Sequence, residues 1–412
     1  MATYRDQGWA SVMLPTYRGD VTPTPGPDFD PARLLPDDLL ERFRSRAAGY
    51  DEENAFPQDD FDELVELGYT RLAVPASQGG HGLGLLEIAA LQSRLATAAP
   101  ATALAINMHL VWTVTAAVLA ARGDTTLSLV LDDAARGEVF AFGVSEPCND
   151  LVLFDSTTTA VPLADGSYSF TGTKIFTSLS PVWTRLGVFG RDDSEPGAPV
   201  VVHGFATRDT AGHSSLGDWD TVGMRATQSH TTVLDGVVVD ASRIVRRLPV
   251  GPSADSLVFG IFAAFETLIA SVYRGIARRA VELAVDAAVN RTSRRTGATG
   301  ADDPVTRWRI ADLAIALDGL EPQVDRIAQD LDDLVDHGAD WFPRLVGLKH
   351  RATSTASSIV DGAVTVAGGA AFRRTSELGR LYRDVLAGRF HPSSSDSAHA
   401  TVANRLLGPA AG

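Results

Sequence analysis

The sequence predicts an α+β protein whose regions follow the order helices, strands, helices. Residues 31–136 and 251–412 place apolar residues at helical spacing, whereas residues 137–250 consist of short runs rich in Val, Thr and Phe. Strands and helices do not alternate, so a doubly wound nucleotide-binding fold is not expected. Residues 1–30 contain the proline-rich stretch TPTPGPDFDPA and are predicted to form an extended arm.

The first helical region contains four helical patterns. The stretch DDLLERFRSRAAGYDEE has apolar residues near helical spacing, and DFDELVELGYTRL carries acids in its first turn, where they suit the positive end of the helix dipole. The stretch GGHGLGLLEIAALQSRLATAAP indicates a glycine loop, a helix and a proline stop. The next stretch, ATALAINMHLVWTVTAAVLAARGD, is apolar on nearly all sides and is therefore expected at the centre.

The middle region is predicted to be an antiparallel β domain, either a sandwich or a barrel. Its segments are separated by Gly, Asp, Pro or Ser and read VFAFGVS, TTTAVPL, GSYSFTGTKIFTS, RLGVFGR, PVVVHGFAT and HTTVLDGVVVD. Helical patterns return from about Ser253 and continue to the end of the chain. The apolar stretch LVFGIFAAFETLIASVY is interrupted by Glu266 and is expected to be a buried helix rather than a membrane span.

Composition narrows the classes of function. The 412 residues exceed what one hydrophobic core usually covers, so two or three domains are expected in one body. A net charge of −15 and dispersed basic pairs argue against nucleic acid or an anionic membrane as a partner. The single cysteine, Cys148, excludes an internal disulfide and a cysteine metal site, fits a reducing cytoplasm, and is expected to be packed. No signal-peptide pattern opens the sequence.

Five motifs carry a family resemblance. In order they read AFGVSEP (141–147), FTGTKIFTS (170–178), VGMRATQSHTTVLDGVVV (222–239), VAGGAAF (366–372) and LGRLYRD (378–384). Together they resemble the acyl-CoA dehydrogenase superfamily over roughly residues 30 to 410. The resemblance implies an N-terminal all-α domain, a central β domain and a C-terminal four-helix bundle, assembled as a homodimer or homotetramer. It also implies a flavin between the β domain and the bundle: FAD, or in some oxygenases FMN or reduced flavin.

The same resemblance implies which residues contact the flavin. The strand AFGVSEP would line the isoalloxazine ring with Phe142, Val144 and Ser145, and its donors would face the edge where charge grows on reduction. The motif KIFTS would place Phe176 beside the ring and add two hydroxyls. The remaining contacts, in part from a neighbouring subunit, would come from Thr177, Ser178, Arg294, Arg295, Thr296, Thr365, Gly368, Gly369, Ser394 and Asp396.

The first departure from the dehydrogenases concerns the thioester ligand. After Ser-Glu-Pro the chain reads CNDLVLF, and Leu151 stands where a ligand-binding serine is expected. The usual grip on CoA is therefore not predicted.

The second departure concerns the carboxylate that removes the α-proton of the substrate. Its usual place, eight residues after Asp384, is Pro392. In a subset of the family the base lies on the first long helix of the C-terminal domain, and alignment on Gly275 places Phe265 there. Glu266 is one residue on, which is a rotation of about 100° on a helix, so it is expected to point elsewhere.

His391 stands near the missing carboxylate, seven residues after Asp384. In the flavin-dependent monooxygenase branch of the family a histidine at a similar place is thought to assist the flavin C4a-hydroperoxide or the substrate. Such chemistry uses a proton donor and acceptor with a pKa near neutrality. The sequence therefore favours a two-component flavin monooxygenase with His391 and Ser145 as catalytic residues. Its partners would be O₂, a flavin reductase and a small nitrogen, sulfur or aromatic compound of secondary metabolism.

Three alternatives stay open at this point. In the first, the chain is a dehydrogenase of an acyl thioester with FAD and with Glu266 or an unrecognised residue as its base, which the dehydrogenase-like Ser-Glu-Pro supports. In the second, the chain is a catalytically inactive subunit that stabilises an active paralogue. The third concerns His391 alone, which would only cap or pack a loop.

Overall fold

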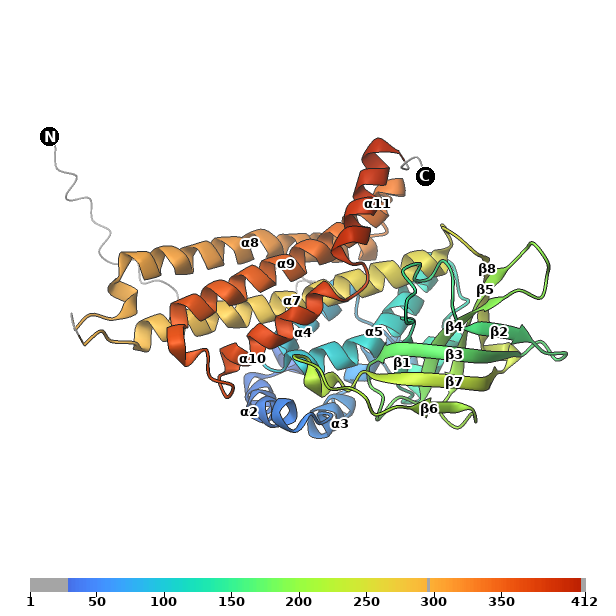
Figure 1. Ribbon diagram of the computed structural model, residues 1–412, viewed down its shortest axis with the longest axis horizontal. Helices are drawn as coiled ribbons and strands as arrows, with labels where there is room; N and C mark the ends of the chain where they lie inside the picture. Colours follow the sequence, from blue (N-terminus) through green and yellow to red (C-terminus); the bar gives the residue numbers. More distant parts are fainter. Residues whose placement is uncertain (1–28, 295–296, 409–412) are drawn as a thin grey trace.

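The computed structural model describes residues 29–294 and 297–408. The predicted N-terminal arm therefore lies almost wholly outside the described residues, as do Arg295 and Thr296. Figure 1 shows the long helices lying side by side along one axis and the sheet packed at one end of them. The order helices, strands, helices confirms the predicted fold class.

The first helical region surrounds one apolar helix, α5. Eighteen of the 22 residues of α5 are buried, which confirms its predicted central place. Pro100 is the first residue of α5, where a missing N–H costs no hydrogen bond, so the proline that stops one helix also starts the next. The helices are α1 (Pro31–Leu34), α2 (Asp37–Glu53), α3 (Gln58–Glu66), α4 (Leu85–Ala96), α5 (Pro100–Ala121) and α6 (Ser128–Ala135).

One eight-stranded sheet follows, with hydrogen-bonded neighbours in the order β6-β7-β3-β2-β4-β5-β8 and β1 paired with β4. The sheet is mostly antiparallel, as predicted, but β1 and β2 both pair with β4 in parallel. The segments of β6 and β8 were not predicted, because HSS and IVRRLP lack apolar alternation. The strands are β1 (Phe140–Gly143), β2 (Thr159–Pro162), β3 (Tyr168–Thr177), β4 (Arg185–Asp192), β5 (Val200–Thr207), β6 (His213–Ser215), β7 (His230–Val239) and β8 (Ile244–Pro249).

The last region is built on α7, which packs against α4, α5, α8 and α9. Helices α5 and α7 are long and apolar enough to cross a membrane, but most of their apolar stretches are buried inside the fold. A Cβ at Gly275 would lie 2.3 Å from the carbonyl oxygen of Ser93, so the α4–α7 crossing requires glycine. The elements are α7 (Ser256–Asn290), α8 (Pro304–Asp332), α9 (Trp341–Ala367), α10 (Glu377–Asp384), the 3₁₀ helix η8 (Val385–Arg389) and α11 (Ser395–Leu407).

A buried histidine joins α5 to the sheet. His109 Nε2 donates to the carbonyl oxygen of Thr70 at 2.7 Å, and the Phe140 N–H donates to Nδ1 at 3.0 Å. Trp112 Nε1, one turn on, donates to the carbonyl oxygen of Ala141 at 3.1 Å. The bonds to Phe140 and Ala141 join α5 to the first two residues of β1, so α5 fixes the position of that strand. Burial lowers the pKa of His109 to about 4, and the bonds require its neutral form.

The neutral His109 makes stability depend on pH. Its folded pKa of about 4 lies below the unfolded value of about 6.5, so its contribution is complete above pH 6.5 and falls as the pH drops towards 4. We expect this residue alone to remove about 3 kcal/mol of unfolding free energy between pH 7 and pH 4. Urea titrations at both pH values measure the loss.

The variant His109→Leu isolates the contribution of His109 to the pH dependence of the unfolding free energy. It leaves the Phe140 N–H and the Thr70 carbonyl unpaired, so we expect a loss of about 2–4 kcal/mol at pH 7. Its free energy of unfolding would then fall less steeply with acid than that of the wild type. Equal pH dependence in the two proteins would contradict a neutral, bonded His109.

Candidate active site

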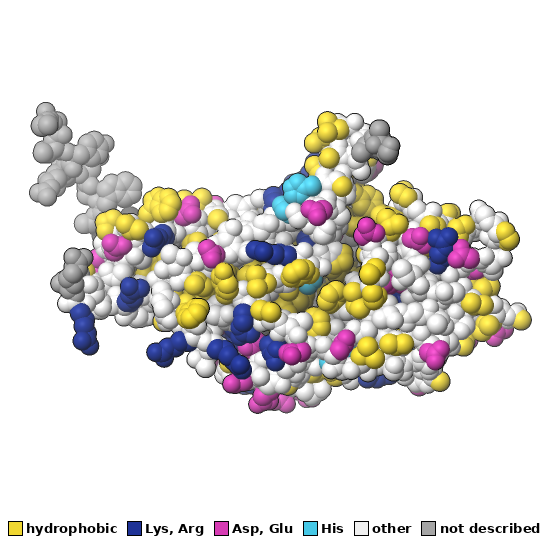
Figure 2. Space-filling view, in the orientation of Figure 1, with side chains coloured by type: hydrophobic (Ala, Val, Ile, Leu, Met, Phe, Trp, Pro, Cys, Tyr) yellow, Lys and Arg dark blue, Asp and Glu magenta, His cyan; other side chains and the backbone are white. Residues whose placement is uncertain are grey.

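Two adjoining cavities lie where β1, β3, α5 and α7 meet the segment from η8 to the start of α11. Their volumes are about 390 and 350 Å³, and we call them the first and the second cavity. Figure 2 shows hydrophobic side chains gathered around a hollow in the middle of this face, below α11 in the view. A ligand in either cavity would meet the seven residues that line both: Phe142, Ser145, Phe176, Phe265, Phe390, His391 and Pro392.

Aromatic rings form the shared walls. Phe142 on β1 stacks on Phe265 of α7, with centroids 5.6 Å apart and planes at 20°. Phe176 at the end of β3 has a positive φ of 58°, is half exposed, and meets Trp219 edge to face at 6.0 Å. The two predicted ring residues Phe142 and Phe176 thus lie at the cavities, and Val144 lines the second one.

The motifs AFGVSEP and KIFTS meet in space. The Ile175 N–H donates to the carbonyl oxygen of Ser145 at 2.9 Å, which joins the end of β1 to β3. The Ser145 hydroxyl faces both cavities and has no hydrogen-bond partner among the described residues. Ser178 lines the first cavity and its hydroxyl bonds to that of Ser229 at 2.7 Å. Thr177 is fully buried and lines neither cavity, so the structure does not bring this predicted contact to the site.

The glutamate of Ser-Glu-Pro is part of a buried ion pair. Glu146 Oε1 accepts from Lys174 Nζ at 2.5 Å, and the carboxylate also accepts from the Ser156 hydroxyl and two backbone N–H groups. Although burial opposes it, the nearby Lys174 lowers the pKa of Glu146 to about 2. Burial lowers the pKa of Lys174 to about 8. Glu146 lines the second cavity and Lys174 lies behind it, and the pair fixes the two flavin-strand motifs relative to each other.

His391 lines both cavities, but its acidity differs from the prediction. Its Nε2 lies 3.0 Å from the Tyr273 hydroxyl, and its Nδ1 has no partner within the described part of the chain. Burial and the charge of Lys349 lower its pKa to about 3. The predicted pKa near neutrality is therefore wrong, because the ring is enclosed beside a cation. At neutral pH His391 is an uncharged imidazole.

Glu266 was expected to point elsewhere because of its place beside Phe265, but it lines the second cavity, although not the first. Its Oε1 accepts from the N–H of Ser393 at 3.1 Å and from the Ser393 hydroxyl at 2.9 Å. Its Oε2 is buried without a partner, and burial raises the pKa of the carboxyl to about 8. Phe265, not a carboxylate, faces both cavities.

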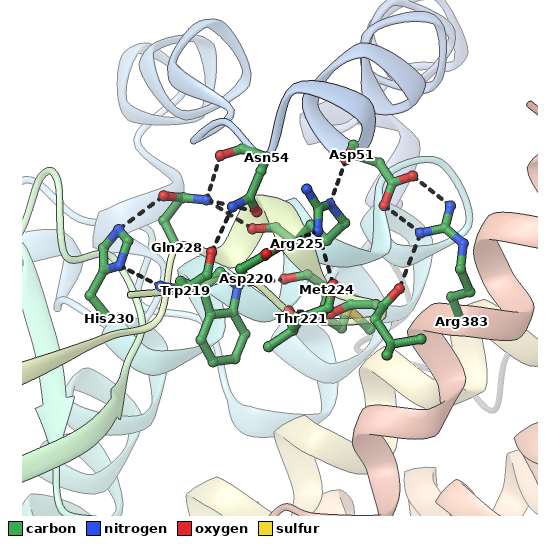
Figure 3. Close-up of polar contacts among 12 residues, drawn as sticks. Asp51, Asn54, Trp219, Asp220, Thr221, Met224, Arg225, Gln228, His230 and Arg383 are labelled. Carbon is green, nitrogen blue, oxygen red and sulfur yellow. Dashed lines mark hydrogen bonds and ion pairs between the residues drawn. The ribbon is translucent and has the colours of Figure 1, made fainter. Parts of the chain in front are cut away.

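The Arg-Asp of LGRLYRD anchors the loop between β6 and β7. Arg383 forms two bonds with the carboxylate of Asp51 on α2, at 2.9 and 2.5 Å, and donates to the carbonyl oxygen of Val222 at 3.1 Å. Asp384 accepts from the Met224 N–H at 2.6 Å. Figure 3 shows Arg383 reaching across to Asp51 beside this loop.

The same loop is tied to α2 at its other end. The Asn54 amide donates to the carbonyl oxygen of Trp219 at 2.6 Å, and the Gln228 amide donates to that of Asn54 at 2.8 Å (Figure 3). The loop supplies the outer wall of the first cavity through Trp219, Asp220, Thr221, Val222, Gly223 and Met224. The Arg-Asp motif is therefore a structural tie across three elements.

Other predicted contacts lie elsewhere in the chain. Arg294 follows α7 and Gly368 ends α9, about 36 Å along the bundle from Glu266 by helix rise. Thr365 and Gly369 lie at the same end as Gly368, so none of the four reaches the cavities within one chain. Ser394 lines the second cavity as the N-cap of α11, whereas Asp396 is exposed and lines neither cavity.

The prediction that Cys148 is packed is wrong. Cys148 is exposed, in the turn that follows β1, where its φ is 58°. Leu151, at the place of the missing ligand serine, is also exposed. No group of three or more His, Cys, Asp or Glu side chains that would hold a metal ion exists among residues 29–294 and 297–408.

Comparisons with known proteins agree with this architecture. Residues 38–128 match the family described as acyl-CoA dehydrogenase, N-terminal domain, and residues 267–395 match acyl-CoA dehydrogenase, C-terminal domain. The amino sugar nitrososynthase DnmZ of Streptomyces peucetius is 30% identical over 375 residues, which cover 87% of this chain and 89% of that protein. The chain belongs to the acyl-CoA dehydrogenase superfamily. It is accordingly a flavin-dependent oxidoreductase on this fold.

Two further proteins are similar to this chain over most of their length. The putative acyl-CoA dehydrogenase YdbM of Bacillus subtilis is 29% identical, over 87% of this chain and 92% of that one. A solved structure of KijD3 with FMN and a dTDP-linked amino sugar is 28% identical, with a TM-score of 0.83 over 94% of this chain and 96% of that one. The family is thus established, and the residues at the cavities carry the choice between reactions.

Sequence reasoning missed two residues that hold the site, Tyr273 and Lys349. A signal for Lys349 was present in the composition. The chain contains 36 basic residues, and Lys174 and Lys349 are its only lysines. Both are buried, whereas most of the described arginines are at least partly exposed, with Arg274 and Arg380 as buried exceptions. A lysine kept in an arginine-rich chain indicates a place where a compact ammonium fits and a planar guanidinium does not.

The buried Glu146–Lys174 pair can be tested by a double-mutant cycle. The variant Lys174→Met leaves a buried carboxylate without its cation, so we expect a loss of about 3–5 kcal/mol in unfolding free energy. The matched double variant, Glu146→Gln with Lys174→Met, should recover part of that loss. Chemical denaturation of the four proteins measures it, and additive effects would contradict a coupled pair.

Proposed function

We propose that the protein is a two-component flavin monooxygenase that acts on a small nitrogen, sulfur or aromatic compound. The observation that carries this proposal is the side chain at the place of the base. Phe265 lines both cavities, whereas Glu266 lines only the second one and its Oε1 accepts two hydrogen bonds from Ser393. A dehydrogenase needs a carboxylate over the substrate α-carbon, whereas oxygen transfer does not. The nitrososynthase relative supports the oxygenase reading.

The shared walls fit a flavin ring. The unpartnered Ser145 hydroxyl, the Ser178 hydroxyl and the aromatic faces of Phe142 and Phe176 offer hydrogen bonds and stacking to a flat heterocycle. A bound reduced flavin would supply two electrons, so that one atom of O₂ enters the substrate and the other leaves as water. We propose that the flavin arrives reduced, as FMN or FAD, from a separate reductase, as in a cytoplasmic two-component system.

His391 would act as a neutral hydrogen-bond acceptor. With Nε2 on the Tyr273 hydroxyl, its Nδ1 is left to face the cavities. An imidazole with so low a pKa accepts a hydrogen bond from a substrate N–H or O–H and holds that group in place, but does not take its proton. The enclosing aromatic side chains exclude water from the same space.

The alternative is a dehydrogenase of an acyl thioester. The Ser-Glu-Pro motif and the relative YdbM favour it, and the raised pKa of Glu266 would suit a base. Against it stand the exposed Leu151 at the ligand turn and the hydrogen bonds that turn Glu266 towards Ser393.

The deciding experiment follows reduced flavin in oxygenated buffer. We expect the anaerobically loaded protein to form a transient species that absorbs at shorter wavelength than oxidised flavin and decays slowly in stopped-flow traces. The variant His391→Gln should shorten its lifetime by about tenfold, which corresponds to the loss of about one hydrogen bond. The variant Glu266→Gln keeps an acceptor oxygen for Ser393, so it should still form the transient.

Two other sets of results would contradict the proposed monooxygenase and establish one of the alternatives. Direct return to oxidised flavin in the wild type, together with bleaching of oxidised enzyme by acyl-CoA that Glu266→Gln abolishes, would establish the dehydrogenase. Protein that binds neither oxidised nor reduced flavin would establish an inactive partner subunit.

A further inference from the structure

The segment that carries His391 is fixed from two sides by buried charged groups. It runs from Gly388, near the end of η8, to Ser393, two residues before α11. A Cβ at Gly388 would lie 2.8 Å from Thr353 on α9 and 2.8 Å from Tyr273 on α7, so the segment lies against both helices at this point.

Lys349 on α9 holds this segment by its carbonyl groups. Its Nζ donates to the carbonyl oxygens of Gly388 at 3.0 Å, His391 at 2.8 Å and Ser393 at 2.9 Å. An ammonium has three N–H donors, and each one has its own acceptor here. The planar fork of arginine does not offer three donors to acceptors that converge on one point.

Glu266 on α7 holds the end of the same segment. Its Oε1 accepts both the N–H and the hydroxyl of Ser393. Tyr273 is seven residues further along α7, which is nearly two full turns, so it lies on the same face as Glu266. From that face its hydroxyl meets His391 Nε2 at 3.0 Å. One helix face thus fixes both the end of the segment and the imidazole.

We propose that Lys349 and Glu266 are positioning residues that hold the segment 388–393 so that His391 presents Nδ1 to the cavities. The inference rests on the proposed function only for what His391 does there. The charged and titratable groups that face this segment are Tyr273 and Glu266 from α7 and Lys349 from α9. Removing the Lys349 charge should make His391 easier to protonate, since that cation disfavours the imidazolium.

The test reads the histidine directly, in protein without flavin or substrate. Histidine-selective ¹³C labelling and NMR titration follow the nine histidines of the chain, and His391→Gln assigns the signal. In the wild type His391 should not titrate above about pH 5. In Lys349→Met its pKa should rise by at least about one unit towards the ordinary value.

Two variants separate charge from geometry. Lys349→Arg keeps the charge and loses the three-way bond, so amide hydrogen exchange of residues 388–393 should accelerate at least about tenfold while the His391 pKa stays low. Thr353→Val, one turn along α9, removes a hydroxyl that bonds only to the helix backbone, and it should change neither readout.

The proposal fails if folded Lys349→Met shows wild-type values for both the His391 pKa and the exchange of residues 388–393. Should that variant not fold, Glu266→Gln carries the test, because it keeps the shape and one acceptor oxygen. The weaker acceptor should speed exchange at Ser393 severalfold without raising the His391 pKa, and unchanged exchange would overturn the proposal. Neither readout involves the oxygen reaction, so these outcomes stand apart from those of the stopped-flow test.

Discussion

The structure depends on the burial of α7. This helix packs against four others, and close crossings at Gly260 and Gly275 leave no room for a side chain. Its single fully buried arginine, Arg274, is satisfied by Asp325 and by groups of α4, so the helix does not slide without exposing an unpaired charge. Because α7 is fixed in this way, Phe265, Glu266 and Tyr273 have fixed positions at the cavities.

Two buried lysines likewise fix the positions of the two walls of the site. Lys174 fixes the β1 and β3 motifs through Glu146, and Lys349 fixes the segment that carries His391. In each case the ammonium group lines neither cavity and donates its hydrogen bonds to oxygen atoms of the protein. Buried ammonium groups are costly unless every donor is paired, so such sites tolerate few alternative arrangements. The rigid parts of the site are therefore polar, and the walls that a ligand meets are aromatic.

The fold could be predicted because its signals are local. Helical spacing, β-branched runs and motif order are readable along the chain, and they led to the right fold class. Two short strands were missed, since β6 and β8 have no apolar alternation. The site was predicted in part: Phe142, Ser145, Phe176 and His391 do meet at the cavities. The sequence does not show which side chains surround a residue in the folded protein. Those surroundings set both the low pKa of His391 and the hydrogen bonds that Glu266 accepts from Ser393.

The acidity of His391 bears on the mechanism more than its position does. A histidine with a pKa of about 3 is not a proton donor at neutral pH. Of the two groups with pKa values of about 8, Lys349 lines neither cavity and Glu266 lines only the second one. A neutral imidazole beside an aromatic cavity suits a substrate that brings its own N–H or O–H proton. A thioester brings a weakly acidic C–H instead, which calls for an ionised carboxylate with open access. The residue that lines both cavities at that place is a phenylalanine, and this is the ground on which we propose oxygen transfer.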